Sequence, residues 1–273
     1  MKLLNGRVVR DKIKESLKEK VRELSYTPRL EIIDIGGGEE TRTYVTQKQK
    51  FGDDIGVLVQ HNVFNSHTAP EEIIEYIEGL NKEEGVTGII VQLPIPESFS
   101  TERILNTIDP QKDVDGLTDT NKKLLYEGDE PNFVPATARG VIELLDFYRI
   151  TFEGKAVVVG SSDLTGKPIA KLLEQKGMQV TMCDEYTKNI PDLSKEADVL
   201  VSATGKPKLI TKEYVKEGQA VVDVGYSFVD GKVVGDVDFE DVKDTVGAVT
   251  PVPGGVGPMT VAALFENLLR IEK

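Results

Sequence analysis

The chain has 273 residues, 39% of them hydrophobic and 29% charged, which is enough for two globular domains of ordinary size. Its 33 basic and 46 acidic residues give a net charge of −13, which argues against a nucleic-acid partner because such proteins present basic surfaces. No stretch reaches the roughly 18 apolar residues that cross a bilayer, and the N-terminus lacks a signal-peptide pattern, so we expect a cytoplasmic protein without membrane contact. The single cysteine, Cys183, excludes an internal disulfide, and its apolar neighbours favour a core position.

Helices and strands alternate over the first 100 or so residues. From Ile13 to Leu24, apolar residues recur at helical spacing with charged residues between them, as on a helix that faces solvent on one side. Helices are expected over 10–24, over 42–55 and from Pro70, and strands over 30–35, 57–63 and 86–93. Strands that alternate with helices in this way predict a parallel α/β sheet.

A second alternating set follows a polar segment. Residues 109–126 are expected to be irregular, and Pro131 and Asn132 to lie in a linker. A helix over 138–147, strands over 155–159, 179–182, 198–202 and 220–224, and a hairpin around Asp230 and Gly231 are expected after it. We therefore predict two α/β domains that divide near residue 120: residues 1–120, completed by a C-terminal helix over 258–273, and residues 121–257.

The second set begins with a strand, a turn of small residues and the start of a helix. Gly160 and Gly166 flank the turn Gly160-Ser-Ser-Asp-Leu-Thr-Gly166, and a turn of this kind lets a pyrophosphate approach free N–H groups at a helix N-terminus. The spacing differs from the usual G-x-G-x-x-G, so the pattern alone also fits a plain α/β turn. The segment Ala203-Thr-Gly-Lys-Pro207 adds a loop at the same edge of the sheet, where ligands of such sheets bind.

Four polar residues in the first half are candidates for chemistry. Tyr44 and Lys48 are one helical turn apart on the same face, although an ordinary amphipathic helix would show the same spacing. Gln92 ends an almost wholly apolar strand, where a polar side chain faces the edge at which ligands bind. Asp115 lies in Lys112-Asp-Val-Asp115-Gly116, which is also consistent with a solvated turn.

The segment Thr250-Pro-Val-Pro-Gly-Gly-Val-Gly-Pro-Met-Thr260 leads into the last helix. Its prolines and glycines restrict the backbone and let it approach a flat ligand closely, and Pro258 suits the first turn of a helix. Taken alone, the segment could be a rigid linker.

Five segments together resemble the bifunctional methylenetetrahydrofolate dehydrogenase/methenyltetrahydrofolate cyclohydrolase family in order and spacing. They are Tyr44-x3-Lys48, Val91-Gln-Leu-Pro-Ile-Pro96, and the segments over 112–116, 160–168 and 251–260. The resemblance covers almost the whole chain. It implies a Rossmann-like C-terminal domain and an active-site cleft between two domains. It also implies two activities in one-carbon metabolism that serve purine biosynthesis, and a homodimer, with residues 226–234 as a candidate contact.

The resemblance also implies roles for particular residues. In the two-step reaction, 5,10-methylenetetrahydrofolate gives up a hydride, and the methenyl product is hydrolysed to 10-formyltetrahydrofolate. The implied catalytic residues are Lys48, Tyr44, Gln92 and Asp115, and the implied folate-binding residues are Tyr44, Asp115, Pro253 and Gly257. The implied cofactor-binding residues are Thr137, Gly160, Ser161, Ser162, Glu185, Tyr226 and Thr260.

Three departures from the family pattern concern the cofactor. The segment Pro135-Ala-Thr-Ala-Arg-Gly140 stands where relatives usually have Pro-Cys-Thr-Pro-x-Gly, and Ser161 stands where they often have arginine. Asp184 and Glu185 follow a strand where NADP-dependent relatives have neutral or basic residues, and a carboxylate there favours an unphosphorylated ribose. NADP is expected as the family's cofactor, with Ser161, Ser162 and Lys188 able to hold its phosphate, and NAD is the alternative.

Two other functions are compatible with such a chain. One is a monofunctional NAD-dependent dehydrogenase, against which intact Lys48 and Gln92 argue. The other is a non-catalytic dinucleotide-binding protein, which would be expected to have lost pocket residues in at least one domain. His61 and His67 have no partners at metal-ligand spacing, so no metal is expected.

Overall fold

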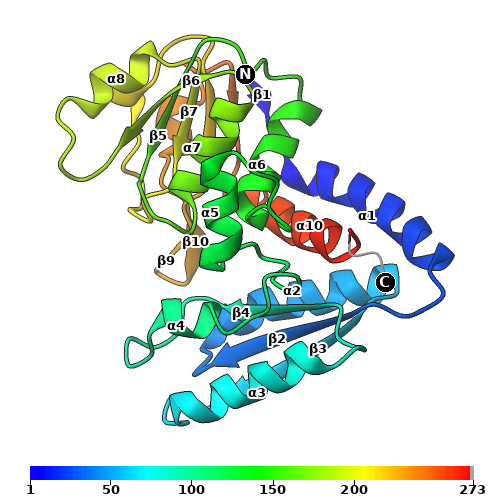
Figure 1. Ribbon diagram of the computed structural model, residues 1–273. Helices are drawn as coiled ribbons and strands as arrows, with labels where there is room; N and C mark the ends of the chain where they lie inside the picture. The colour runs from blue at the N-terminus through cyan, green and yellow to red at the C-terminus, as the bar shows by residue number, and fades with distance from the viewer. Residues whose placement is uncertain (271–273) are drawn as a thin grey trace. The chain divides into compact units, whose positions relative to one another are not determined.

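The computed structural model describes residues 1–270. Within them it forms two compact units (Figure 1). Unit 1 consists of Met1–Asp11 and Thr137–Thr260, and unit 2 consists of Lys12–Ala136 and the C-terminal residues from Val261. No helix among the described residues is long and apolar enough to cross a membrane.

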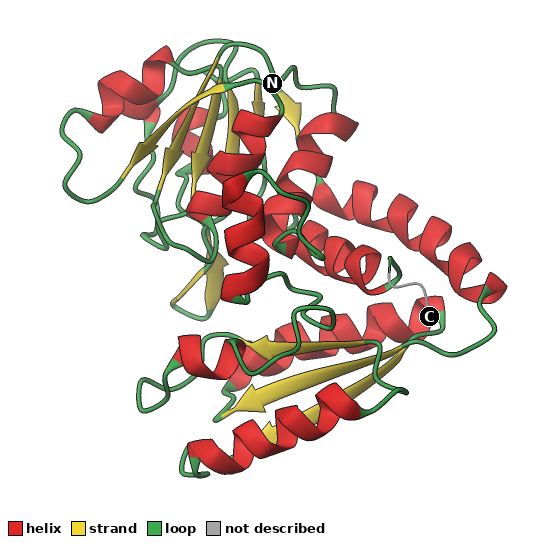
Figure 2. Ribbon diagram, viewed as in Figure 1, coloured by secondary structure: helices red, strands yellow, loops and turns green. Residues whose placement is uncertain are grey.

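Unit 2 is built on a parallel three-stranded sheet in the order β3-β2-β4. Its strands are β2 (Arg29–Ile35), β3 (Leu58–Phe64) and β4 (Gly88–Gln92). Its helices are α2 (Glu39–Ile55), α3 (Pro70–Lys82), α4 (Thr101–Leu105) and α5 (Asp119–Glu127), together with parts of α1 (Gly6–Glu23) and α10 (Val256–Leu268). Figure 2 shows α2 and α3 on opposite faces of this sheet. Leu30 and Ile32 of β2 pack with Phe51 of α2 and Phe265 of α10 in one core.

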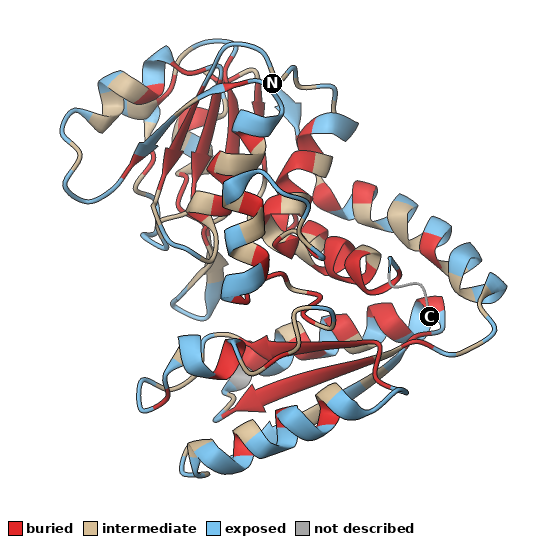
Figure 3. Ribbon diagram, viewed as in Figure 1, coloured by how far each residue is buried: buried red, intermediate tan, exposed pale blue. Residues whose placement is uncertain are grey.

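Unit 1 is built on a six-stranded sheet in the order β1-β11-β8-β7-β5-β6, in which every neighbouring pair is parallel. The strands are β1 (Lys2–Leu3), β5 (Lys155–Val159), β6 (Gln179–Cys183), β7 (Val199–Ser202), β8 (Ala220–Asp223) and β11 (Ala248–Val249). Its other elements are α6 (Ala136–Phe147), α7 (Gly166–Gln175), α8 (Ile190–Glu196), α9 (Phe239–Val242), the 3-10 helix η1 (Lys212–Tyr214), and the hairpin strands β9 (Ser227–Val229) and β10 (Lys232–Val234). Figure 3 shows the central strands β5, β7 and β8 buried. Cys183 is fully buried in this core, as expected.

The division of the chain differs from the boundary expected near residue 120. Residues 121–136 belong to unit 2, because Phe133 and Ala136 pack into its core and Nδ2 of Asn267 donates to the Val134 carbonyl oxygen at 2.9 Å. The first residues belong to unit 1 because β1 pairs with β11. Residues 271–273 of the expected C-terminal helix lie outside the described residues.

The expectation of irregular structure over 109–126 is wrong at its end, where α5 begins at Asp119. Thr118 caps this helix by accepting the Asn121 N–H, and Leu125 is buried. A helix of only 9 residues with few apolar positions gives little periodic signal. Local capping and tertiary packing therefore decide its formation.

Candidate active site

A buried lysine and a buried glutamine meet at the carboxyl end of β4. Lys48 lies on α2, and its Nζ donates a 2.7 Å hydrogen bond to Oε1 of Gln92, the last residue of β4. Nε2 of Gln92 donates to the Leu93 carbonyl at 2.9 Å, which fixes the amide with its oxygen toward the lysine. Each of the two residues is only 7% exposed. The fold therefore gives the amine of Lys48 a neutral acceptor in a largely dry environment.

The charges of Lys48 and Asp115 act on each other in this environment. Burial lowers the pKa of Lys48, and the negative charge of Asp115 acts in the opposite direction. Burial raises the pKa of the half-buried Asp115 to about 6, with the charge of Lys48 lowering it and that of Asp113 adding to the rise. An amine and a carboxyl group in unit 2 are thus both displaced toward their uncharged forms.

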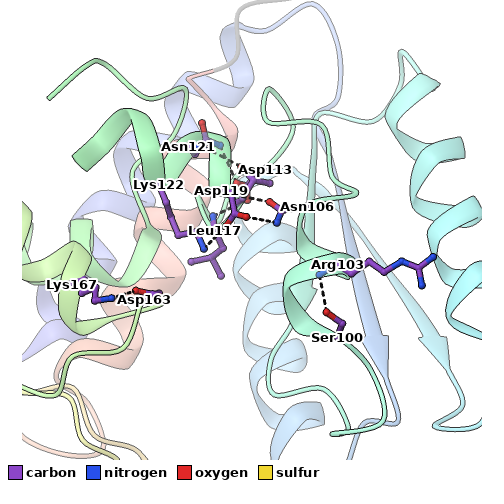
Figure 4. A network of polar contacts seen from close by, with 11 residues as sticks. Ser100, Arg103, Asn106, Asp113, Leu117, Asp119, Asn121, Lys122, Asp163 and Lys167 are labelled. Atoms are coloured by element: carbon purple, nitrogen blue, oxygen red, sulfur yellow. Dashed lines mark hydrogen bonds and ion pairs between the residues drawn. The ribbon is translucent and has the colours of Figure 1, made fainter. Parts of the chain in front are cut away.

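The turn that carries Asp115 is held by the residues just before it. Nζ of Lys112 donates to the carbonyl oxygens of Leu80, Asn81 and Glu83. Figure 4 shows Asp113 accepting hydrogen bonds from the backbone of Leu117 and from the side chain of Asn121, which are 3.2 and 3.0 Å long. Lys112 and Asp113 of the sequence motif therefore stabilise the turn.

Tyr44 lies on α2 one turn before Lys48, as its spacing predicted, and it is half-buried. A further polar residue was missed by the sequence analysis: Asp34 is paired in register with Gln92 on the neighbouring strand. Side chains in register point to the same face of a sheet, and Asp34 is only 2% exposed. Its Oδ2 lies 2.8 Å from Nε2 of His61, so this histidine has a carboxylate partner. The signal that could have identified Asp34 in the sequence is a charged residue inside an otherwise apolar strand.

In unit 1 the glycine turn lies at the point where the strand order reverses. The chain passes from β5 to β6 on one side and then returns across β5 to β7 on its other side, so these two connections run in opposite directions. Ligands of open α/β sheets bind at such a point. Gly160 follows β5 with φ +109°, and a Cβ there would overlap the carbonyl oxygen of Ala203. Only glycine fits both conditions. Helix α7 then begins at Gly166, whose N–H donates to Oγ of Ser162 at 3.4 Å. This turn and helix start are the candidate site for a pyrophosphate group.

The two carboxylates after β6 differ in their surroundings. Oδ1 of Asp184 accepts the Tyr186 N–H at 3.0 Å and the Thr187 hydroxyl at 2.8 Å. The hydrogen bond from Thr187 is the main cause of the lowered pKa of Asp184. Glu185 is exposed. The carboxylate of Asp184 thus closes its own turn, and Glu185 is the better candidate for a ligand contact.

The remaining candidate residues all belong to unit 1. The Thr260 hydroxyl donates to Oγ1 of Thr137 at 3.3 Å, so these two side chains meet across 123 positions of sequence. Tyr226 is half-buried just before β9, Pro253 is exposed, and Gly257 lies near the start of α10. The structure groups the cofactor candidates with Pro253 and Gly257 in unit 1, whereas Lys48, Tyr44, Gln92 and Asp115 belong to unit 2. Within residues 1–270, no group of three or more His, Cys, Asp or Glu side chains could hold a metal ion.

A glycine turn and helix start at the switch point of a parallel sheet define the class of α/β dinucleotide-binding enzymes. Comparison with known families makes the assignment specific. Residues 4–115 match the catalytic domain of tetrahydrofolate dehydrogenase/cyclohydrolase, and residues 135–273 match the NAD(P)-binding domain of the same enzyme. The chain belongs to the tetrahydrofolate dehydrogenase/cyclohydrolase family.

Individual relatives agree with the family assignment. The bifunctional protein FolD of Hydrogenobaculum sp. is 42% identical over 275 residues, covering 100% of this chain and 99% of the relative. The crystal structure of the bifunctional FolD of Campylobacter jejuni is 40% identical with a TM-score of 0.95, covering 99% of this chain and 98% of that one. The Trypanosoma brucei enzyme, solved with NADP and an inhibitor, is 36% identical with a TM-score of 0.92, covering 98% and 95%.

Proposed function

We propose that the protein performs both reactions of its family. It oxidises 5,10-methylenetetrahydrofolate to 5,10-methenyltetrahydrofolate with NADP as cofactor, and it hydrolyses the methenyl product to 10-formyltetrahydrofolate. The observation that carries this proposal is the buried 2.7 Å hydrogen bond between Lys48 and Gln92. A protein limited to dehydrogenation would not need a lysine whose pKa is lowered by burial.

We place the dinucleotide at the glycine turn of unit 1, because this turn joins β5 to the start of α7 beside the loop after β7. When bound, it accepts the hydride that leaves the one-carbon bridge of the folate. We propose that Gly160, Ser161 and Ser162 hold its phosphates, that Glu185 lies toward its adenosine ribose, and that Thr137, Tyr226 and Thr260 hold the nicotinamide end. Hydride transfer then needs mainly the positioning that these residues supply.

Lys48 is the proposed base of the hydrolytic step. Water adds to the methenyl carbon and releases a proton, which Lys48 can accept only as the uncharged amine. The bond from this carbon to one ring nitrogen then breaks, and that nitrogen takes up the remaining hydroxyl proton to give the 10-formyl product. Burial lowers the pKa of Lys48 and so favours that form, and Gln92 holds the amine without the negative charge that would favour its protonation. Asp115 accepts from the N–H groups of the pterin ring, and Tyr44 contacts the same ring. Pro253 and Gly257 would contribute backbone surface to folate binding.

The test replaces Lys48 by methionine, which keeps the length of the side chain but removes the amine. Lys48→Met should lower the rate of methenyl hydrolysis at least about 100-fold while dinucleotide affinity stays within about twofold, since general base catalysis contributes this much and Lys48 lies outside unit 1. Absorbance of the methenyl compound measures hydrolysis, and calorimetry measures binding. Lys50→Met, an exposed lysine on the same helix, is the control. Normal hydrolysis by Lys48→Met would remove this residue from the mechanism.

We further propose that the enzyme is a cytoplasmic homodimer that provides 10-formyltetrahydrofolate for purine biosynthesis. The bacterial FolD relatives support the cytoplasm. Phe228 and Val229 of the hairpin are 51% and 40% exposed, which supports this hairpin as the contact between subunits. Light scattering at micromolar concentration should give twice the 30.0 kDa chain mass, and a mass of one chain would contradict the dimer.

A further inference from the structure

A buried carboxylate outside the proposed site holds the loop that follows β7. Asp236 lies just after β10 and is completely buried. Its Oδ2 accepts hydrogen bonds from the hydroxyl of Ser202 at 2.9 Å and from both the N–H and the hydroxyl of Thr204, at 2.7 and 2.9 Å. The N–H of Gly205 approaches the same oxygen at 3.3 Å. One side chain thus fixes the end of β7 and the first residues of its loop.

A second buried carboxylate fixes Asp236 itself. Oδ1 of Asp223, at the end of β8, accepts the backbone N–H groups of Gly225 and Asp236, each at 2.9 Å. Its Oδ2 accepts the Val237 N–H at 2.9 Å. A Cβ on Gly225 would overlap Oδ1 of Asp236, so the two Asp-bearing segments pack closely. The ends of β7, β8 and β10 are thereby joined in one hydrogen-bonded cluster.

The loop after β7, which Asp236 holds, packs against the glycine turn that begins at Gly160. The Ala203 N–H donates to the Val159 carbonyl at 2.8 Å, and the carbonyl oxygen of Ala203 occupies the space that a side chain on Gly160 would need. The next peptide N–H, that of Thr204, is the one held by Asp236. A displacement of this peptide would therefore change the space in front of Gly160.

We propose that Asp236 is a positioning residue for the dinucleotide: through the peptide between Ala203 and Thr204, it keeps the Gly160 turn in the shape that admits the phosphates. The proposal rests on the dinucleotide site proposed above. Asp236 makes no contact with the cofactor in this role, and the hydrolytic step, which uses Lys48 of unit 2, does not depend on it.

The test compares three variants of the full chain. Asp236→Ala removes every acceptor, and Asp236→Asn retains one accepting oxygen. Asp238→Ala removes a half-buried carboxylate two residues away that pairs with Lys208. Calorimetry with NADP and with NAD measures dinucleotide affinity. Methenyl hydrolysis, which needs no dinucleotide, measures the rest of the enzyme, and the KM and kcat of the dehydrogenase are measured alongside.

Asp236→Ala should raise the Kd and KM for the dinucleotide about tenfold or more, as expected when several hydrogen bonds that hold a binding loop are lost. Hydrolysis should stay within about twofold, Asp236→Asn should recover most of the affinity, and Asp238→Ala should match the parent. Unchanged dinucleotide affinity in a folded Asp236→Ala variant would overturn the proposal. So would a parallel fall of both activities together with the melting temperature, since that pattern indicates a purely structural role.

Thr204→Val provides a second route if Asp236→Ala does not fold. It keeps the shape of the side chain but removes the hydroxyl that donates to Asp236 and accepts the Lys206 N–H. It should therefore raise the dinucleotide Kd by about threefold without affecting hydrolysis, and an unchanged Kd would overturn the proposal. A parent enzyme that binds dinucleotide but turns over no folate would contradict the proposed function. The dinucleotide affinities of the parent and the variants would still decide the role of Asp236. A parent that binds neither NADP nor NAD would overturn both.

Discussion

Lys48 and Asp115 oppose the effect of burial on each other: the carboxylate raises the pKa of an amine that burial lowers, and the amine lowers the pKa of a carboxyl group that burial raises. The outcome for Lys48 is a lowered pKa, with Gln92 as its hydrogen-bond acceptor. The proton affinity of the proposed base is therefore sensitive to the charge of its neighbours. This makes the pH dependence of hydrolysis a test of the site.

Replacing Gln92 by glutamate should shift the pH profile of methenyl hydrolysis toward alkaline pH. The new carboxylate would lie at the 2.7 Å contact with Nζ and would favour the protonated amine, so less of the base is available at neutral pH. The rate of hydrolysis against pH measures the shift. Asp115→Asn, which removes a charge that raises the pKa of Lys48, should move the profile in the opposite direction. Gln60→Glu on the exposed side of β3 serves as the control, and a profile unchanged by Gln92→Glu would exclude Lys48 as the titrating group.

Asp115→Ala should weaken folate binding more than dinucleotide binding. A hydrogen bond to a charged acceptor is worth about 1.5–3 kcal/mol, which corresponds to roughly ten- to a hundredfold in affinity. Calorimetry with a folate ligand and with NADP gives the two losses separately. Asp129→Ala, which removes an exposed carboxylate from the same unit, should change neither affinity. Equal losses for both ligands in Asp115→Ala would assign this residue a structural role.

Glu185→Gln should raise the affinity for NADP and leave that for NAD nearly unchanged. A carboxylate about 4 Å from a phosphate charge costs on the order of 4 kcal/mol at an effective dielectric constant near 20, so an increase of about tenfold or more is expected. Asp184→Asn should have the smaller effect, because the carboxylate of Asp184 is held in its own turn by Tyr186 and Thr187. Titration of both dinucleotides measures the change, with Glu174→Gln on α7 as the control. An NADP affinity that neither substitution improves would show that this pair does not face the phosphate.

The stability of the protein should fall as pH rises through the range in which Asp223 titrates. Burial raises the pKa of Asp223 from 3.8 to about 7, so between these values the folded state holds a proton that the unfolded state has lost. The unfolding free energy contributed by this group is therefore highest below about pH 4 and declines up to about pH 7, by on the order of a few kcal/mol.

Urea unfolding at pH 5 and pH 8 measures this decline. Asp223→Asn is expected to be less stable at both values, because an amide cannot accept the hydrogen bonds on both sides of the carboxylate, but its change between the two pH values should be smaller than that of the parent. Equal changes in the parent and in the variant would contradict the raised pKa.

The amino-acid sequence by itself determined the alternating pattern of helices and strands, because the apolar face of each element appears as apolar residues that recur every few positions. The strands at 30–35 and 155–159 were predicted at or within a residue of their ends, and the helical spacing of Tyr44 and Lys48 was enough to place both on one face. The turn between Gly160 and Gly166 was also predictable, since small residues between a strand and a helix leave few other arrangements.

The tertiary structure alone decided what lies beside these residues. The two-residue strand β1 forms by pairing with β11 near the other end of the chain, and β11 in turn pairs with β8. Lys48 acquires its lowered pKa only when folding buries it against Gln92, 44 positions away, and Asp236 reaches Thr204 across 32 positions. Loss of water and pairing of buried polar groups depend on contacts between distant segments, and no local spacing encodes them.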